Sequence, residues 1–517
     1  MSEEAKEHWI VYPLGSKPRW PSAFLLGFQQ YLTMFGATVL IPFIVGGAIK
    51  MPQDQLALLI ATIFFTSGIC TLIQQSPLGN RLPVIQGGTF SFLSPTFAII
   101  GMVAAKGVGS SGLPLWQLQI QEIAGAIMIA SVVEIVLGYT GIMGQLRKLI
   151  SPIVIAPTIA MIGLALFNLG APWMAGNWAG NWIISGITIV ALILYSQVFS
   201  LKSRAFMLFP VLLAIVTGWV CAFIGTAAGW IPATATAYLK TDLIFSSPWF
   251  SLMPLMPFKW GFPDFASTTL WAGVFAMLAG YIASMIESIG DYYACARISE
   301  APVPTGKMIS RGLGAEGLGC LIAGILQTAN GTTTYSENIG SIGLTRVASR
   351  RVVRAGAVLM LIIPVIGKFS AVLATIPHPV VGAMFVGLFG MIAAVGLSNL
   401  QLVNLNNSRN LFIIGISFFA GLSFPYHFNS MLSASAQPIG WGQPGELVNV
   451  LGMILQALLT TGMFVTAFIG ILLDNLLPGA TKAERGLEVW EKEASDEAWE
   501  KAEAEWAALE EGEARAV

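Results

Sequence analysis

The chain has 517 residues, of which 55% are hydrophobic and only 10% are charged, and its mean hydropathy is +0.74. An average soluble domain is about 25% charged, so this composition excludes a soluble globular protein and indicates a polytopic membrane protein. The net charge of −1 hides an asymmetry, because residues 481–517 hold 12 of the 27 acidic side chains. The sequence contains no Walker loop, zinc signature or nucleophile elbow, so no motif favours ATP-driven transport or an enzyme.

Fourteen apolar stretches approach the roughly 20 residues that cross a bilayer as a helix. They fall at 23–47, 55–73, 84–105, 121–141, 149–169, 182–200, 207–230, 269–292, 310–327, 333–345, 355–375, 380–397, 410–425 and 448–473. Lys and Arg gather in every second connection, so the positive-inside rule predicts that both termini are cytoplasmic. The opening residues lack a cleavable signal pattern, and we expect an integral protein of the plasma (inner) membrane.

The third and tenth stretches are unusually polar and rich in glycine, and they occupy the same place in two sets of seven. Because seven is odd, the second set must run inverted relative to the first, an architecture that places substrate between two broken segments. We therefore predict an all-α polytopic membrane protein with 14 transmembrane segments in two inverted seven-span repeats, broken by short strands and half-helices in spans 3 and 10. The expected divisions are a cytoplasmic N-terminal segment (1–22), the first repeat (23–230), an extracellular connection (231–268), the second repeat (269–473) and an acidic, helical cytoplasmic tail (474–517).

Two carboxylates in the eighth stretch are candidates for function. Glu287 and Asp291 are four residues apart, so they share one face of a helix. A carboxylate at membrane depth is costly and indicates a functional site. Other acids within or near the spans are interpreted as boundary or packing residues, because they lie nearer span ends or lack polar neighbours: Glu122, Glu134, Glu316 and Asp474.

The two polar stretches have the pattern of an extended strand that meets a short helix. In the third stretch this is the run 87–91, and in the tenth it is 336–340. Helix starts present free N–H groups and a partial positive charge to a ligand oxygen. With Glu287 and Glu337 facing each other across such a site, the arrangement suits a flat ligand that carries both N–H donors and C=O acceptors. The aromatic residues expected beside its ring are Phe90 and Tyr335.

The segment Glu337-Asn338-Ile339-Gly340, followed by Thr345-Arg346, resembles the signature of the nucleobase–ascorbate transporter family. The stretches TTYSENIG and MFGATVLIP (Met34–Pro42) resemble bacterial uracil permeases, whereas ESIGDYYACARIS is closer to animal ascorbate and nucleobase members. The similarity covers about residues 20–475 and leaves out the acidic tail.

The resemblance implies 14 spans in two inverted repeats, a core domain (spans 1–4 and 8–11) that moves against a gate domain (spans 5–7 and 12–14), and often a homodimer. It also implies roles for particular residues. Substrate-binding positions would be Glu287, Glu337, Phe90, Tyr335, Ala37, Asn338, Ser336 and Gln29. Cation coupling would involve Asp291 and Glu287, and the signature or gating positions would be Gly340, Thr345 and Arg346.

Two departures from the family pattern affect the expected function. The first span reads Gln29-Gln30 where many members have Gln-His, so proton coupling through that histidine is excluded. Ascorbate-type members carry proline at the first signature position, whereas Glu337 here resembles the nucleobase members.

The sequence thus predicts a secondary active importer of a nucleobase, of the uracil or xanthine/uric acid type, that works by cation-coupled symport with alternating access. The coupling ion is H⁺ or Na⁺, and the sequence does not choose between them. The alternative is a sodium-coupled ascorbate transporter of the same fold. A channel is disfavoured, because the polar residues gather in two places instead of lining a continuous pore. No enzymatic activity, cofactor, bound metal or nucleic-acid partner is expected.

Overall fold

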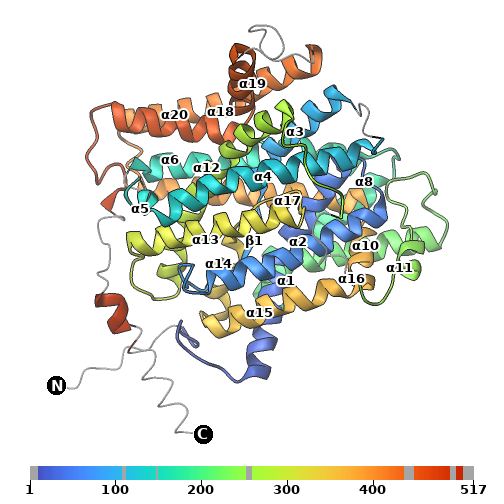
Figure 1. Cartoon of the computed structure of the whole chain (residues 1–517). Coiled ribbons are helices and arrows are strands. Elements are labelled where there is room, and N and C mark those ends of the chain that lie inside the picture. Colours follow the sequence, from blue (N-terminus) through green and yellow to red (C-terminus); the bar gives the residue numbers. More distant parts are fainter. Residues whose placement is uncertain are drawn as a thin grey trace.

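The computed structural model describes residues 10–107, 112–146, 149–251, 259–435, 447–488, 497–502 and 504. Much of the predicted tail helix therefore lies outside the described residues. The described chain consists mainly of helices, and its one two-stranded sheet lies at the centre of the bundle (Figure 1).

The elements of the first part of the chain run from α1 to α10. They are α1 (Trp20–Ala48), α2 (Gln53–Gln74), β1 (Gln86–Gly88), the 3-10 turn η1 (Phe90–Phe92), α3 (Leu93–Lys106), α4 (Leu115–Tyr139), α5 (Ile142–Leu146), α6 (Pro152–Leu164), η3 (Phe167–Leu169), α7 (Gly170–Ala175), α8 (Asn181–Ile193), the π-helical η4 (Leu194–Val198), η5 (Phe199–Leu201), α9 (Arg204–Leu208) and α10 (Pro210–Ala227).

The second part begins with a short helix in the predicted connection. Its elements are α11 (Asp242–Ser246), α12 (Thr268–Ile298), α13 (Gly306–Ile325), β2 (Thr332–Thr334), α14 (Ser336–Thr345), α15 (Arg350–Ile362), η7 (Ile363–Val365), α16 (Gly367–Ala374), α17 (His378–Ser398), η8 (Asn399–Leu402), α18 (Ser408–Ser435), α19 (Leu447–Leu459) and α20 (Gly462–Leu476).

Each of the fourteen predicted apolar stretches coincides with helical structure. Ten of the described helices are long and apolar enough to cross a membrane, and two shorter apolar helices are Phe90–Lys106 and Gly462–Leu476. The predicted stretch 355–375 is interrupted by η7, where Pro364 cannot donate a backbone hydrogen bond. The third and tenth stretches are each a strand followed by a short helix, as their polar sequences predict.

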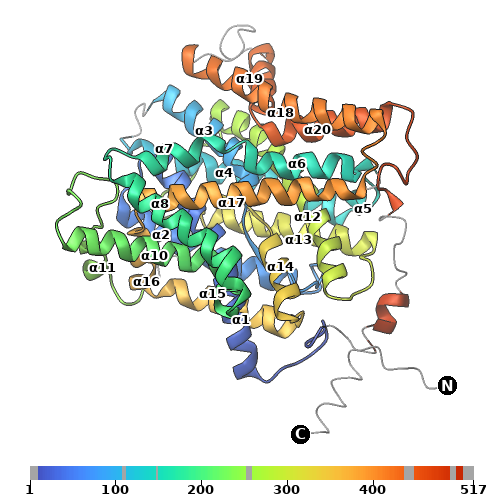
Figure 2. The same cartoon turned by 180° about the vertical axis from the view of Figure 1, so that it is seen from behind.

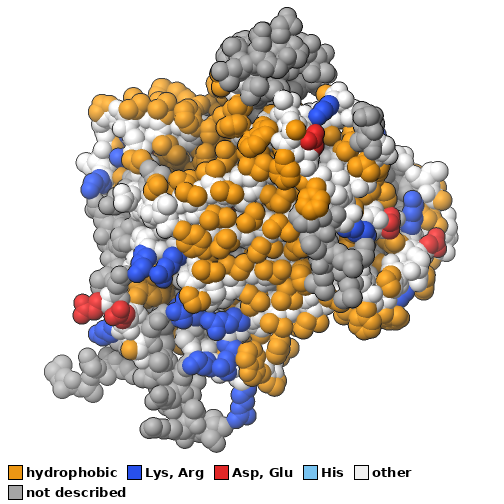
Figure 3. All heavy atoms as spheres, viewed as in Figure 1, with side chains coloured by type: hydrophobic (Ala, Val, Ile, Leu, Met, Phe, Trp, Pro, Cys, Tyr) orange, Lys and Arg blue, Asp and Glu red, His pale blue; other side chains and the backbone are white. Residues whose placement is uncertain are grey.

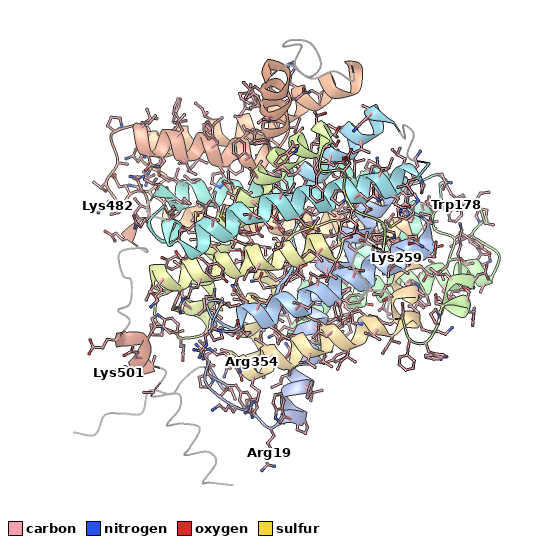
Figure 4. All side chains as sticks on the ribbon, viewed as in Figure 1. Arg19, Trp178, Lys259, Arg354, Lys482 and Lys501 are labelled. Atoms are coloured by element: carbon pink, nitrogen blue, oxygen red, sulfur yellow. The ribbon has the colours of Figure 1, made fainter. Side chains whose placement is uncertain are left out.

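The surface has an apolar band between two polar ends. Hydrophobic side chains cover most of the middle of the face seen in Figure 3, and charged groups gather toward its two sides. Leu25, Ile183 and Phe419 are 70%, 65% and 75% exposed, as expected for side chains that face lipid. Figure 4 shows Lys482 and Lys501 on one side of the molecule, with Trp178 and Lys259 on the opposite side.

The helices pack in two groups. In the first, α4 packs along α13 and α12, and α1 packs along α15. In the second, α6 lies beside α17, α18 beside α20 and α8 beside α10; α6 and α17 run together across Figure 2. Small residues allow the closest approach in the first group, since a Cβ at Gly138 of α4 would lie only 2.2 Å from the backbone nitrogen of Gly314 of α13. Such small-residue contacts are typical of helices in membranes.

Asp474, interpreted from the sequence as a boundary or packing residue, lies near the end of α20 and is the centre of a buried polar cluster. Its carboxylate accepts hydrogen bonds from Arg409 (Nη1, 3.0 Å), from Arg485 (Nε to Oδ1, 3.0 Å; Nη2 to Oδ2, 2.8 Å) and from Ser151 Oγ (2.6 Å). These residues come from α20, the start of α18, the segment after α20 and the start of α6. The position of Asp474 near a span end agrees with the sequence interpretation, whereas its polar partners lie far away in the sequence and were not predicted.

Candidate functional site

The two polar segments meet as a pair of antiparallel strands. Gln86 lies opposite Thr334, Gly87 opposite Thr333 and Gly88 opposite Thr332. The pairing continues to Tyr335, whose N–H donates to the carbonyl of Ile85 at 3.0 Å. Each strand is followed at once by the start of a helix, so the pairing brings the starts of η1 and α14 to the middle of the bundle.

Glu287 of α12 lies beside the first of these helix starts. Its Oε2 atom accepts a hydrogen bond from Ser91 Oγ at 3.0 Å and a longer one from Thr89 Oγ1 at 3.5 Å. Thr89 also caps η1, because its Oγ1 accepts from the N–H of Ser91 at 3.1 Å. The N–H of Thr89 donates to Oδ1 of Asn330 at 2.8 Å. The hydroxyl groups of Ser91 and Thr89 therefore hold one carboxylate oxygen of Glu287 in place. The Glu287 side chain is only partly buried.

Tyr335 is held over β1 by a tight contact. A Cβ at Gly87 would lie 2.2 Å from Cε2 of the Tyr335 ring, closer than side chains approach one another. The hydroxyl of Tyr335 shares a hydrogen bond of 2.8 Å with Thr38 Oγ1 on α1. Ala37, the neighbour of Thr38, is buried on the same helix. Glycine at position 87 thus leaves room for the ring against the strand, and the hydroxyl of Tyr335 connects the ring to α1.

Phe90 connects η1 to the second group of helices. Its ring meets the ring of Phe389 on α17 edge to face, with centroids 5.0 Å apart. Phe389 in turn stacks on Phe385, one turn earlier on α17. Phe90 is therefore a contact between the two helix groups, directly before α3.

Asp291 and Glu337 lie close to Glu287. Oδ1 of Asp291 accepts a hydrogen bond from Ser336 Oγ at 2.7 Å, and Oδ2 is buried without a hydrogen-bond partner. Glu337 is half-buried in the first turn of α14. The three carboxylates are near enough to interact electrostatically. Among the described residues, no group of three or more His, Cys, Asp or Glu is arranged to hold a metal ion.

Sequence reasoning missed Glu316, which it interpreted as a boundary or packing residue. Its Oε1 accepts from Thr334 Oγ1 (2.6 Å), the Tyr292 hydroxyl (2.7 Å) and Gln86 Nε2 (3.0 Å), and its Oε2 accepts from Ser288 Oγ (2.6 Å). One buried carboxylate thus binds both strands and α12 together. The signal in the sequence was a set of Thr, Gln, Ser and Tyr side chains spread over some 250 positions, which no local pattern reveals.

Gln30, and not its neighbour Gln29, makes the contacts between α1 and α14. Asn338 Nδ2 donates to Gln30 Oε1 at 2.7 Å and to the Gln30 carbonyl at 2.9 Å, and Ser341 Oγ donates to the same Oε1 at 3.2 Å. Gln29 lies on α1 with its Nε2 buried and unpartnered. The amide nitrogen of Asn338 therefore fixes α14 to α1. The amide oxygen Oδ1 of Asn338 is buried and has no hydrogen-bond partner.

The remaining signature residues form the end of α14. Thr345 Oγ1 donates to the Ser341 carbonyl at 2.8 Å, and Arg346 follows in a left-handed conformation with φ of 61°. The Arg346 carbonyl accepts from the N–H groups of Val11 (2.9 Å) and Tyr12 (3.1 Å), so an extended N-terminal segment lies against this helix end. Gly340 is exposed, and a Cβ there would meet nothing within 4 Å.

A cavity of about 440 Å³ approaches the site along α12. Gly290, which follows Glu287 by three residues, lines it together with Tyr293 and Arg297. The opposite wall comes from α6 (Pro152, Ile155) and from η8 and the end of α17. The cavity thus separates α12 from the second helix group at the end where Arg297 lies.

Comparison with known proteins identifies the family. A family model for xanthine and uracil permeases, described as "Permease family", matches residues 21–430. Solute carrier family 23 member 2 of Mus musculus is 42% identical over 523 residues, which cover 94% of this chain and 77% of the relative. Nucleobase-ascorbate transporter 1 of Arabidopsis thaliana is 34% identical over 496 residues, covering 93% and 92%. The chain belongs to the nucleobase–ascorbate transporter family.

As a member of the nucleobase–ascorbate transporter family, the chain is an integral membrane protein that acts on a small molecule. Its relatives are carriers, in agreement with the prediction that it is not an enzyme. A solved structure of the murine Solute Carrier 26 family member A9 anion transporter, in the inward-facing state, aligns with a TM-score of 0.56 at 11% identity. It covers 81% of this chain and 68% of that chain. At this identity the likeness concerns the fold alone.

Proposed function

We propose that this nucleobase–ascorbate transporter imports a nucleobase of the uracil or xanthine/uric acid type by cation-coupled symport with alternating access. One arrangement carries the proposal: Glu287 and Glu337 lie at the paired strands β1 and β2, next to two helix starts. A nucleobase is flat and offers N–H donors beside C=O acceptors. The carboxylates accept from its N–H groups, and backbone N–H groups at the helix starts donate to its carbonyls.

The other expected substrate contacts follow from the same geometry. Phe90 and Tyr335 flank the base, and the small side chain of Ala37 leaves room for it beside Thr38. Ser336 and Asn338 hold the first turn of α14, which carries Glu337, through Asp291 and Gln30. Gln29 is a further polar residue of α1. Its unpartnered Nε2 is available to a carbonyl oxygen after a side-chain rotation.

The architecture we propose has 14 spans in two inverted seven-span repeats, residues 23–230 and 269–473. Its support is that each half contains one strand followed by a half-helix, and that these two breaks pair with each other. The first helix group (α1–α4 and α12–α16) is then the core and the second (α6–α10 and α17–α20) is the gate. The orientation follows the positive-inside rule, with both termini cytoplasmic in the plasma membrane. The assembly is a homodimer.

Alternating access requires the core to move against the gate. The cavity between α12 and the α6–α17 wall lies at this boundary and reaches to within one helical turn of Glu287. On the other side of the site, the edge-to-face contact between Phe90 and Phe389 joins the core to the gate. Movement of the gate that separates these two rings, while the cavity closes, exposes the site to the opposite side of the membrane.

The coupling ion is H⁺ or Na⁺, and both use Asp291 in this proposal. Oδ2 of Asp291 is buried without a partner, one helical turn from Glu287. A proton on either carboxyl group removes one of the like charges near the base. Na⁺ would instead take Oδ2 and nearby backbone carbonyls as oxygen ligands. In either case the occupied cation site favours substrate binding and links the two gradients.

Sodium-coupled ascorbate transport by the same fold is the second candidate. The observation in its favour is the eighth-span stretch ESIGDYYACARIS, which resembles animal ascorbate and nucleobase members of the family. Glu337 opposes it, because ascorbate-type members of the family carry proline at this position, whereas Glu337 resembles the nucleobase members.

The test is uptake of labelled uracil and xanthine, each competed with ascorbate, by proteoliposomes under an imposed proton or sodium gradient. Accumulation of a base that ascorbate does not compete supports the proposal, and the effective gradient identifies the ion. Glu337→Gln should raise the KM for the base about tenfold, since one charge-assisted hydrogen bond contributes roughly 1.5–3 kcal/mol. Glu488→Gln, in the exposed segment after α20, is the matched control. Ascorbate accumulation without base uptake would reject the nucleobase assignment.

A further inference from the structure

A second cavity lies at the far end of α1, away from the basic end of α12. It measures about 480 Å³ and is formed by four segments: the end of α1, the start of α2, residues 233–240 of the connection, and the turn from α16 into α17. This volume is within the range of small-molecule sites, about 300–1,000 Å³. The predicted topology places this end of the protein outside the cell.

The charged residues that line this cavity are all basic. They are Lys240 and Lys50, which lies in a left-handed turn just after α1, and no Asp or Glu of the described residues lines the cavity. Both lysines are exposed, and neither ammonium group has a salt bridge or hydrogen bond within the described part of the chain. The acids nearest in sequence are Asp54 for Lys50 and Asp242 for Lys240, and neither lines the cavity. The carboxylate of Asp54 accepts a hydrogen bond from Gln55.

The helix ends do not change the sign of the electrostatic potential in this cavity. The helices α2 and α17 begin there with their positive ends, and α1 and α16 end there with their negative ends. Partial charges of opposite sign therefore largely cancel. The two lysines decide the potential, so the cavity attracts anions.

Two aromatic rings give the cavity a shape preference. Tyr238 and His378 both line it. One face of the His378 imidazole is covered by Trp173, with centroids 4.6 Å apart and an interplanar angle of 11°. Two ammonium groups and two flat side chains suit a planar organic anion better than a small inorganic one.

The cavity lies above the proposed substrate site on two of its helices. On α1, Gly47 of the cavity is ten residues beyond Ala37, and on α17, His378 is eleven residues before Phe389. At 1.5 Å per residue these separations are about 15 Å and 16 Å. A molecule in the cavity therefore lies at the outer ends of α1 and α17. The middle parts of these two helices border the proposed substrate site.

We propose that this outer cavity is an anion-collecting site, in which Lys50 and Lys240 bind the substrate in its anionic form before it reaches Glu287 and Glu337. The inference rests on the proposed function, because it concerns the substrate of the same transporter. It extends that function by ranking substrates: anionic bases such as urate gain from the cavity, and neutral uracil does not. A cleft lined by charges of one sign raises the local concentration of the oppositely charged ligand.

The test compares initial uptake of urate and uracil at neutral pH in proteoliposomes. The variants are Lys50→Gln, Lys240→Gln and the double variant, with Lys259→Gln as the control, since Lys259 is exposed and does not line the cavity. Each cavity substitution should raise the KM for urate roughly threefold at low ionic strength, about the effect of one unit charge several ångströms away in water. The double variant should raise it about tenfold, with an unchanged kcat and an unchanged KM for uracil. The difference should vanish at about 0.5 M salt because the charges are screened.

A second measurement separates the two proposals. Binding of labelled urate to the purified full chain that carries Glu337→Gln reports on the outer cavity when central binding is weakened, and it should fall when both lysines are replaced. The cavity proposal would be overturned if replacing the two lysines changed neither the KM nor the binding of urate, or if it raised the KM for uracil equally. Either result would leave the transport function in place. Failure of wild-type protein to accumulate any base would reject the proposed function, and lysine-dependent urate binding would still support the cavity.

Discussion

Replacing Gly87 with alanine tests the geometry of the site without altering any charge. The added methyl group would lie 2.2 Å from Cε2 and 2.9 Å from Cζ of Tyr335, and 3.1 Å from Cε of Met34. Contacts this short force the ring away from β1. The backbone of Gly87 cannot retreat, because it is paired with Thr333.

The magnitude follows from what the ring loses. Overpacking of this kind costs about 1–3 kcal/mol of folding stability, and the hydrogen bond between Tyr335 and Thr38 contributes about 1 kcal/mol. Stacking of a base on an aromatic side chain is worth about 1–3 kcal/mol. Gly87→Ala should therefore raise the KM for the base at least tenfold and lower the thermal midpoint by a few degrees.

The assay is initial-rate uptake in proteoliposomes, with thermal unfolding of the purified protein in parallel. Gly101→Ala on α3 is the matched control, because a Cβ at Gly101 meets nothing within 4 Å. Thr38→Val removes the hydrogen bond but leaves the ring in place, so it should show only the smaller part of the effect. A Gly87→Ala protein with wild-type KM and stability would refute the idea that the ring of Tyr335 is positioned by its contact with β1.

Two further substitutions test the buried carboxylates whose hydrogen-bond partners local sequence reasoning did not identify. Glu316→Gln keeps the size of the side chain but replaces one acceptor oxygen by a donor, so the four hydrogen bonds that the carboxylate accepts are not all kept. Uptake should fall at least tenfold. Full activity would show that β1 and β2 hold their pairing without this carboxylate. Asp474→Asn leaves Arg409 and Arg485 without their buried charged partner, so the free energy of unfolding should fall by about 3 kcal/mol. Asp242→Asn on the surface helix α11 is the control. Equal stability of the two variants would contradict the role of the cluster.

The sequence by itself determined the membrane character, the approximate positions of the apolar helices and the two polar interruptions. These properties depend on local composition, because a helix in lipid satisfies its own backbone and needs only a long apolar segment. The same local pattern predicted a strand followed by a helix in each interruption. It also selected Glu287 and Asp291, because they share one face of an apolar helix, and Glu337, because it lies in one of the two polar interruptions.

Only the tertiary structure decided which polar groups serve one another. The register of β1 with β2 joins residues almost 250 positions apart, and it makes Glu316 the acceptor for both strands. The same is true of Gln30, whose partners lie on α14, and of Asp474, whose partners come from three other segments. Hydrogen bonds between distant segments depend on how the helices pack, and packing depends on side chains from all of them at once. A short window of sequence contains only one partner of each pair. For that reason the sequence did not predict the hydrogen bonds of Glu316 and Asp474.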